Sequence, residues 1–200
     1  MKISEIKSLG KKQMQNNWGY SVLVLLVISA ISSAGGMIFI GIFLLIGPLM
    51  VGQAKYFLRD ARHQQPSFET AFAGFKDYGR NMASGLLMYL FVFLWSLLLF
   101  IPGIIKSLSY AMTPYILADN PNIGPREAIN ESRRMMNGNK GKLFKMYLSF
   151  IGWILLSILT LGILFILYVS PYMTASLANF YNELKKSEDG NADSSEAVIA

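Results

Sequence analysis

The feature that most constrains this chain is the position of its charged residues. No charged residue lies in 13–54, in 81–105 or in 146–182, which are runs of 42, 25 and 37 residues. A helix needs about 20 mostly apolar residues to cross a bilayer, so the first and third runs each have room for two crossings. Only 15% of the residues are charged, whereas soluble domains average roughly 25%. The sequence therefore predicts an all-α integral membrane protein and excludes a disordered chain, a coiled coil and, without cysteine, a disulfide-stabilised scaffold.

The basic residues predict the orientation of these crossings. All but one of the 18 Lys and Arg residues, and all 12 acids, lie in four segments that flank or separate the apolar runs. Cytoplasmic loops carry an excess of Lys and Arg, so all four segments face the cytoplasm if each run crosses twice. We therefore expect a polytopic bundle of about six transmembrane helices, arranged as three hairpins, with both termini cytoplasmic. The outer turns are expected at 32–36, 101–103 and 159–162, where glycine or proline permits a tight turn.

The second hairpin, at 86–118, is the weak part of this prediction. Its second arm, 104–118, has 15 residues and reaches about 22 Å as a helix, against an apolar core of about 30 Å. The alternatives are a re-entrant hairpin, which gives four or five crossings, or a locally thinned bilayer. A cleavable secretory signal is disfavoured because apolar sequence resumes directly after the first arm and no soluble domain follows.

The chain also contains a weak threefold repeat within one predicted domain, 1–186. The units are 1–60, 61–120 and 121–186, and the second helix of each contains a proline, at Pro48, Pro114 or Pro171. Proline removes a backbone hydrogen bond and kinks a helix. Either the three kinked helices simply pack around one another, or the kinks open a cavity or gate, as in transporters with broken helices. The remaining segment, 187–200, is polar and acidic, which predicts a disordered cytoplasmic tail.

Each unit is predicted to begin with a cytoplasmic amphipathic helix. Apolar residues recur at helical spacing in each leader, most clearly as Phe68, Phe72 and Phe75 in the second. Such helices either lie in the membrane interface with their basic groups toward lipid phosphates, or cover the cytoplasmic ends of the bundle as lids. The two interpretations are compatible.

The densest basic segment lies between the second and third apolar runs. Its six members are the candidate contacts to anionic lipid or to a partner protein: Arg126, Arg133, Arg134, Lys140, Lys142 and Lys145. Near an anionic membrane surface each basic residue contributes on the order of 1 kcal/mol of attraction. Without a predicted soluble domain, lipid is the expected partner and nucleic acid is not.

Lys106 is the one basic residue outside the four charged segments. An ionisable group inside an apolar run is by default a functional-site hypothesis, and Tyr110 lies one helical turn away. In the six-crossing arrangement Lys106 lies near the outer surface, where its long side chain can reach the headgroups. An ion or substrate contact, and a polar contact between helices, are the alternatives.

Catalytic signatures are absent from the sequence. With one histidine, His63, and no cysteine, we expect no zinc-thiolate site, no metal cluster and no thiol nucleophile. The run at 138–142 lacks the spacing of a phosphate-binding loop. We therefore expect a protein that is not an enzyme and carries no cofactor.

Several short motifs of this sequence, in their order and spacing, resemble those of the bacterial integral-membrane family called domain of unknown function 975. They include Ile101-Pro102-Gly103-Ile104-Ile105-Lys106, Ser109-Tyr110-Ala111-Met112-Thr113-Pro114-Tyr115, Ser132-Arg133-Arg134-Met135-Met136 and Pro171-Tyr172. The resemblance covers most of 1–186. It implies a multi-pass protein of the cytoplasmic membrane, mainly in Gram-positive bacteria, with no established activity. The family distantly resembles the membrane domain of some glycerophosphodiester phosphodiesterases, but their hydrolase residues are missing here.

Two functions are therefore expected from the sequence. The first is a non-enzymatic accessory or organising component that engages anionic lipid, a membrane-protein partner or a second copy of itself through its basic amphipathic helices. The alternative is a small transporter or channel for an unknown solute. Three basic leaders on one side favour the first, and three proline-containing hairpins with Lys106 favour the second.

Overall fold

The computed structural model describes residues 2–36, 39–98 and 100–199, and helices are the only regular secondary structure in this part of the chain. In chain order its elements are α1 (Ile3–Gly36), α2 (Phe39–Ala61), the 3-10 helix η1 (Phe68–Phe75), α3 (Tyr78–Leu98), α4 (Phe100–Tyr110), α5 (Thr113–Asp119), α6 (Pro125–Met135), α7 (Lys140–Leu148), α8 (Ile151–Leu159), the π-helix η2 (Phe165–Val169) and α9 (Ser170–Ile199). The predicted all-α class is confirmed.

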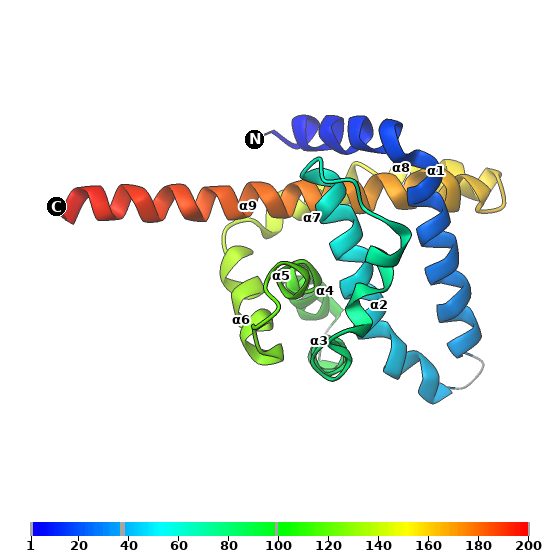
Figure 1. Cartoon of the computed structure of the whole chain (residues 1–200), viewed down its shortest axis with the longest axis horizontal. Coiled ribbons are helices and arrows are strands. Elements are labelled where there is room, and N and C mark those ends of the chain that lie inside the picture. The colour runs from blue at the N-terminus through cyan, green and yellow to red at the C-terminus, as the bar shows by residue number, and fades with distance from the viewer. Residues whose placement is uncertain (1, 37–38, 99, 200) are drawn as a thin grey trace.

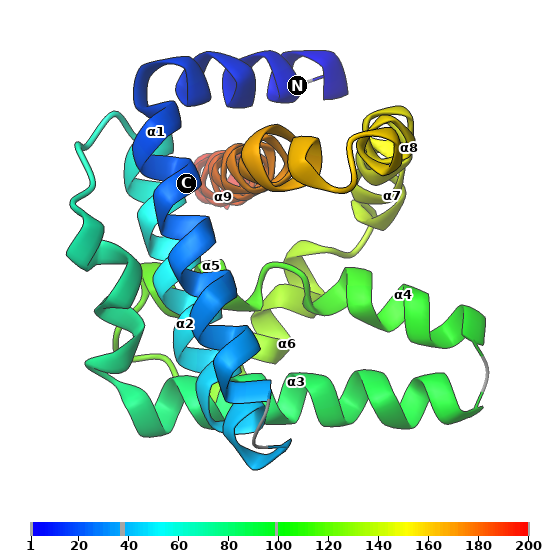
Figure 2. The same cartoon turned by 90° about the vertical axis from the view of Figure 1, so that its right-hand side faces the viewer.

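Three helical hairpins extend from a common centre in different directions. Figure 1 shows the second half of α1 descending beside α2, with the α8–η2 hairpin extending sideways. Figure 2 shows α3 and α4 side by side, running across the direction of α1 and α2. The turn predicted at 32–36 is not found there, because α1 continues as helix to Gly36; residues 37–38 lie outside the described part of the chain.

The predicted six-helix spanning bundle is not confirmed. In the described chain, Tyr78–Leu97 and Lys140–Leu159 are long and apolar enough to span a membrane. A third span arises only if Ile3–Met14 and Asn17–Ser32, bent by 92°, count as one. Charge-free runs overestimate the number of spans because some of their apolar side chains, such as Val24, Leu49 and Phe180, are buried in the protein's own core.

The core lies where α2, α5 and α9 meet. Its largest fully buried side chains include Tyr56 and Phe57 from α2, Ile116 from α5, and Phe180 and Tyr181 from α9. These residues belong to all three predicted repeat units, so each unit contributes the C-terminal part of its second helix to one shared core. The repeat itself stays a prediction from the sequence.

Close helix crossings are made possible by glycine. A Cβ atom on Gly85 of α3 would lie 2.6 Å from the Cα of Gly47 on α2. No side chain larger than hydrogen fits such an approach, so this pair sets how closely α2 and α3 cross, one residue before Pro48.

Near all three prolines, backbone groups without a helical hydrogen-bond partner are bonded by a side chain from another unit. Pro48 leaves the Leu44 carbonyl without its helical donor, and the Tyr78 hydroxyl donates to that oxygen at 3.3 Å. Pro171 does the same to Leu167, whose carbonyl accepts from Trp18 Nε1 at 3.0 Å.

Just before Pro114, one side-chain hydroxyl bridges the break between two helices. α4 ends at Tyr110 and α5 begins at Thr113. Between them, Ser132 Oγ of α6 donates to the Ser109 carbonyl at 2.8 Å and accepts from the Met112 N–H at 3.2 Å. In terms of the predicted units, a side chain of the second unit donates to the backbone of the first, one of the third donates to the second, and one of the first donates to the third.

The prolines consequently differ in their effect. Pro48 lies inside a continuous α2. Pro114 is the second residue of α5, after a break, and Pro171 is the second residue of α9, directly after the π-helix η2. Only at Pro114 is the helix divided by non-helical residues.

The acidic segment 187–200 is predicted to be a disordered tail, and this stays a prediction. α9 continues as helix to Ile199, and Figure 1 shows this end projecting away from the body. Extending a helix that is already nucleated requires fixing only one residue at a time, which composition alone does not indicate.

Candidate functional site

α6 and α7 present the six predicted basic residues on a shared surface. α6 buries Ala128, Ile129, Ser132 and Met135 against the core, which leaves its three arginines, Arg126, Arg133 and Arg134, exposed. On α7, Leu143 and Met146 are buried. Lys142 and Lys145 are exposed there, and Lys140 is partly exposed. The binary pattern of both helices therefore directs the basic groups outward.

One of the six is already paired with acids. Arg134 Nη2 lies 2.5 Å from Glu131 Oε1 and 3.6 Å from Glu188 Oε2. The hydrogen bond that Arg134 donates to the Glu131 carboxylate raises the pKa of Arg134 above its usual value. Because its charge is locally balanced, Arg134 is a poor candidate for binding an external anion.

Lys106 joins two of the other predicted residues. It lies close enough to Arg133 of α6 and Lys140 of α7 for their positive charges to repel its ammonium group. Lys106 Nζ also lies 4.4 Å from the centre of the Trp95 ring on α3, a cation–π contact. We call Lys106, Arg133 and Lys140 the cationic cluster.

The position of Lys106 relative to Arg133 and Lys140 differs from the separation expected in the six-crossing arrangement, whose sidedness stays a prediction. In the six-crossing arrangement Lys106 lay near the outer surface, whereas Arg133 and Lys140 were cytoplasmic. The structure brings the three together because α4 is only 11 residues long and packs against α6 and α7. Tyr110 is buried and its ring lies 6.2 Å from that of Phe91, so the aromatic partner of Lys106 is Trp95.

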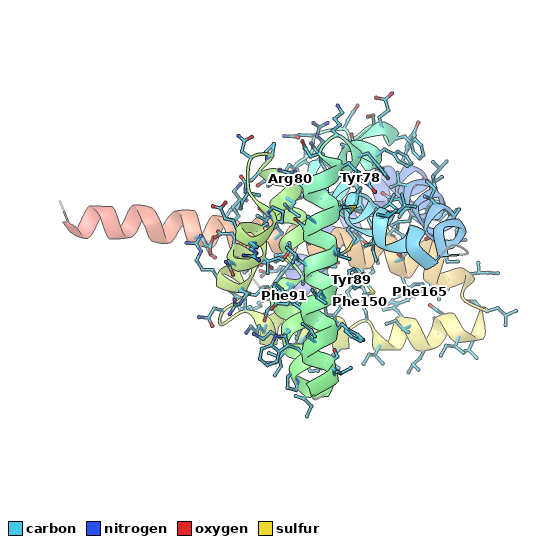
Figure 3. The ribbon with its side chains drawn as sticks, turned by 90° about the horizontal axis from the view of Figure 1, so that it is seen from below. Tyr78, Arg80, Tyr89, Phe91, Phe150 and Phe165 are labelled. Carbon is cyan, nitrogen blue, oxygen red and sulfur yellow. The ribbon has the colours of Figure 1, made fainter. Side chains whose placement is uncertain are left out.

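The three leaders pack on the protein as lids. In the first, Ile6 and Met14 are buried, and Lys7 Nζ lies 4.3 Å from the centre of the Phe150 ring. In the second, Phe68, Phe72 and Phe75 pack against the core. Figure 3 shows Tyr78, whose ring stacks on that of Phe75, at the start of α3.

A buried polar contact ties the first leader to the body. The Asp60 carboxylate of α2 accepts hydrogen bonds from Gln13 Nε2 at 2.9 Å and from Asn17 Nδ2 at 2.5 Å. Asn179 of α9 donates to Gln13 Oε1 at 2.7 Å. The bend of α1 at Asn17 is thus held by side-chain hydrogen bonds to two other helices.

An ion cluster that the sequence did not predict joins the second and third units at the edge of the core. Arg62 Nη1 lies 2.5 Å from Asp119 Oδ1, and Lys185 pairs with the other oxygen of the same carboxylate. Burial raises the pKa of Asp119, but hydrogen bonds from Arg62 and Lys185 outweigh it and hold the pKa at about 2. One signal was present in the sequence, because Arg62 and Lys185 each follow a repeat proline by 14 residues.

Arg80, another basic residue of the second segment, also serves the protein interior. Its guanidinium donates to the carbonyls of Leu117 at 3.2 Å and Asn120 at 3.0 Å, at the C-terminal end of α5. A cation there complements the helix dipole. The positive charge of Arg62 and Arg80 is therefore already used within the structure.

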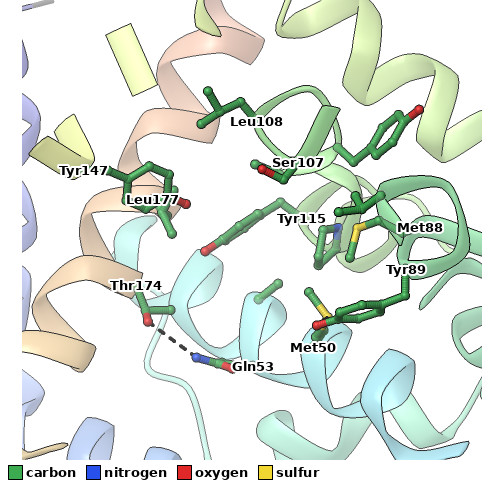
Figure 4. A pocket seen from close by; sticks show the side chains of 15 residues that line it. Met50, Gln53, Met88, Tyr89, Ser107, Leu108, Tyr115, Tyr147, Thr174 and Leu177 are labelled. Atoms are coloured by element: carbon green, nitrogen blue, oxygen red, sulfur yellow. Dashed lines mark hydrogen bonds between the residues drawn. The ribbon is translucent and has the colours of Figure 1, made fainter. Parts of the chain in front are cut away.

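A cavity of about 460 Å³ lies among the three proline segments. Its walls come from α2, α3, α4, α5, α7 and α9, and they include Met50, Pro114 and Thr174, which lie at or within three residues of a repeat proline. Figure 4 shows Tyr115 and Met88 facing this space, with the Gln53–Thr174 hydrogen bond along one wall. The structure therefore contains a cavity as well as packed helices at the prolines.

Much of the apolar surface outside this centre is exposed. Of the spans Tyr78–Leu97 and Lys140–Leu159, only 17% and 22% are buried within the protein. A water-facing helix does not normally present so much apolar surface, so the two helices have the character of membrane spans. Among the described residues there is no group of three or more His, Cys, Asp or Glu side chains placed to hold a metal ion.

The model of a family described as Protein of unknown function (DUF975) matches residues 1–106 and 96–188. The chain belongs to this family. The two overlapping matches cover nearly the whole chain, and the resemblance inferred from its sequence motifs is thereby confirmed. The relation to glycerophosphodiester phosphodiesterases stays a prediction. No curated protein and no solved structure matches the chain.

Proposed function

We propose that this DUF975 protein is a non-enzymatic, multi-pass protein of the bacterial cytoplasmic membrane that binds anionic phospholipid headgroups through its cationic cluster. Lys106, Arg133 and Lys140 come from three different helices, and the positive charges of Arg133 and Lys140 both repel the ammonium group of Lys106. A phosphate group placed among them relieves this repulsion and forms charge-assisted hydrogen bonds. The convergence of these three cations beside apolar, exposed helices is the observation that carries the proposal.

The surroundings of the cluster suit a lipid better than a soluble anion. α3, which supplies Trp95, exposes Leu90, Phe93 and Leu97, and α7 exposes Phe144 and Leu148. Headgroup-level cations flanked by apolar surface are typical of lipid contacts. Holding lipid at this position gives the protein an organising or accessory role in the membrane.

The test compares two double variants that remove the same charge. R133Q/K140Q removes two cluster members, whereas R134Q/K142Q removes one arginine already paired with Glu131 and one exposed lysine. We expect the cluster variant to retain phosphatidylglycerol roughly 30-fold less well in native mass spectrometry, from about 1 kcal/mol per basic residue. Equal losses in the two variants would contradict a specific site and leave only general attraction.

The proposed orientation, with both termini cytoplasmic, has a separate test. Because the chain has no cysteine, single-cysteine variants at Lys2 and Ser187 give unambiguous labelling sites. We expect a membrane-impermeant maleimide to label both only in inverted vesicles. Labelling of either site in right-side-out vesicles contradicts the orientation.

The cavity supports one alternative function, a small transporter or channel. A polar solute crossing beside Pro114 would meet Gln53, Thr174 and several tyrosine hydroxyls. Reconstituted protein that conducts a solute or ion, with flux abolished by K106A, favours this alternative over the accessory role.

A further inference from the structure

The central cavity combines apolar walls with an absence of charge. Its apolar side chains include Met50, Met88, Val92, Leu108 and Leu177, and none of the described residues that line it is charged. Its volume of about 460 Å³ falls within the range of roughly 300–1,000 Å³ usual for small-molecule sites. An ionic ligand would lose its hydration here without gaining a partner, so the cavity selects an uncharged, largely aliphatic group.

The cavity has a closed end and an open end. Tyr115 at the wall is only 5% exposed, whereas Tyr89 is 41% exposed. Ser107, beside the cavity on α4, is also exposed, so the opening lies between α3 and α4. On α3 the neighbouring residues Leu86 and Leu90 are exposed as well. The opening is therefore continuous with the apolar surface that the proposed function places in lipid.

The cavity also lies near the cationic cluster along two helices. On α4, Lys106 precedes the cavity residue Tyr110 by four residues. On α7, Lys140 precedes the cavity residue Tyr147 by seven. Residues at these spacings share a helix face, so each cation is followed on its own face by a tyrosine of the cavity wall. The axial separations are about 6 and 10 Å, which is within the length of a single lipid molecule.

We propose that the cavity holds one aliphatic chain of a membrane lipid, inserted between α3 and α4, with the headgroup left outside near the cationic cluster. The apolar side chains bury the chain, and the open side between Tyr89 and Ser107 lets it leave toward its headgroup. The proposal rests on the membrane location given under the proposed function. It does not require that the cationic cluster selects the headgroup.

The experiment uses lipids with a photoactivatable diazirine in the middle of one acyl chain. Phosphatidylglycerol and phosphatidylcholine with the same labelled chain are incorporated separately into nanodiscs with the full-length protein. After illumination, cross-linked residues are identified by peptide mass spectrometry. We expect adducts on Met88, Leu108 and Leu177 that decline when excess unlabelled lipid is added, beside adducts on exposed Leu90 and Phe93 that serve as an internal measure of surrounding lipid.

Two phenylalanine substitutions make the test specific. A111F fills the cavity from the break between α4 and α5, whereas A83F introduces the same side chain on α3 at a partly exposed position outside the lining. Excluding two methylene groups weakens binding about tenfold, so we expect A111F to remove the cavity adducts and A83F to keep them. If A111F does not fold by circular dichroism and size exclusion, S107F at the exposed opening replaces it.

Each outcome bears on one proposal. Cavity adducts that are absent from the wild type, or equal in A111F and A83F, overturn the chain-binding site. Cavity adducts that form equally from the two lipids leave that site intact but contradict selection of an anionic headgroup. Stronger cavity adducts from phosphatidylglycerol, lost in A111F, support both.

Discussion

The centre of the molecule and the end of its third hairpin are built from the same kinds of residue in opposite environments. Leu117 at the centre is 2% exposed, whereas Leu159 and Leu161 at the turn after α8 are 80% and 93% exposed. The centre also contains the ion cluster and the side chains that serve the prolines. The comparison indicates that the protein is stabilised by its own packing at the centre. The exposed apolar end of the third hairpin is suited to contact lipid, as the proposed function requires.

The sharpest way to break this comparison is to make the same truncation in both regions. We expect L117A to lower the free energy of unfolding by about 2–5 kcal/mol because it leaves a cavity in a packed core. L159A should change it by no more than about 0.5 kcal/mol. Denaturant unfolding in a mild detergent measures both. Equal losses would show that the hairpin end is packed in solution, against the exposure seen here.

The ion cluster predicts a pH dependence confined to the centre. The pKa of Asp119 is about 2 in the folded protein, below the unfolded value of about 3.9. The folded state therefore binds this proton less readily, and the stabilisation is present above about pH 4 and lost as the pH falls toward 2. D119N should flatten the fall in stability over this interval in denaturant titrations. An unchanged slope would assign acid sensitivity to other carboxylates.

The side chains that serve the prolines should have a smaller effect. Y78F removes the hydroxyl that donates to the Leu44 carbonyl, and S132A removes the bridge at Pro114. We expect each substitution to lower the free energy of unfolding by about 1 kcal/mol. The loss should be larger for S132A, because a buried carbonyl and a buried N–H group both lose their partner. Thermal unfolding checks this. Y20F, at a tyrosine that is 65% exposed, is the matched control and should be neutral.

The smallest expected effect on stability is that of K106Q. It removes a cation–π contact with Trp95, worth about 0.5–1 kcal/mol at an exposed site. It also removes the repulsion from Arg133 and Lys140, which offsets this loss. We therefore expect a nearly unchanged unfolding midpoint together with reduced retention of phosphatidylglycerol. A large drop in stability would make Lys106 a structural residue instead.

The difference between the two regions also explains which parts of the fold could be predicted from the sequence. The apolar runs correctly predicted helices, but a hydropathy value is the same for a leucine that faces lipid and one that faces Phe57. The six-span count therefore included helices that bury their apolar faces within the protein. The leaders were predicted as amphipathic. Only the packing of α1 on the other helices made its residues Ile6 and Met14 part of the core.

The candidate site divides in the same way. Arg133 and Lys140 were predicted as a basic surface and Lys106 as a separate intramembrane group, because charge patterning describes neighbours along the chain. Their convergence depends on α4 packing against α6 and α7. Asp119 carried no signal of its own in the sequence, since its partners lie 57 and 66 residues away.

By itself, the sequence determined the helical class, the apolar character, the family, and the positions of the prolines and basic segments, because each of these depends on composition or on local spacing. Only the tertiary structure decided which apolar faces are buried, which cations are already paired, and which side chains complete the backbone at the prolines. These depend on contacts between helices distant in the chain, whose partners no local pattern specifies.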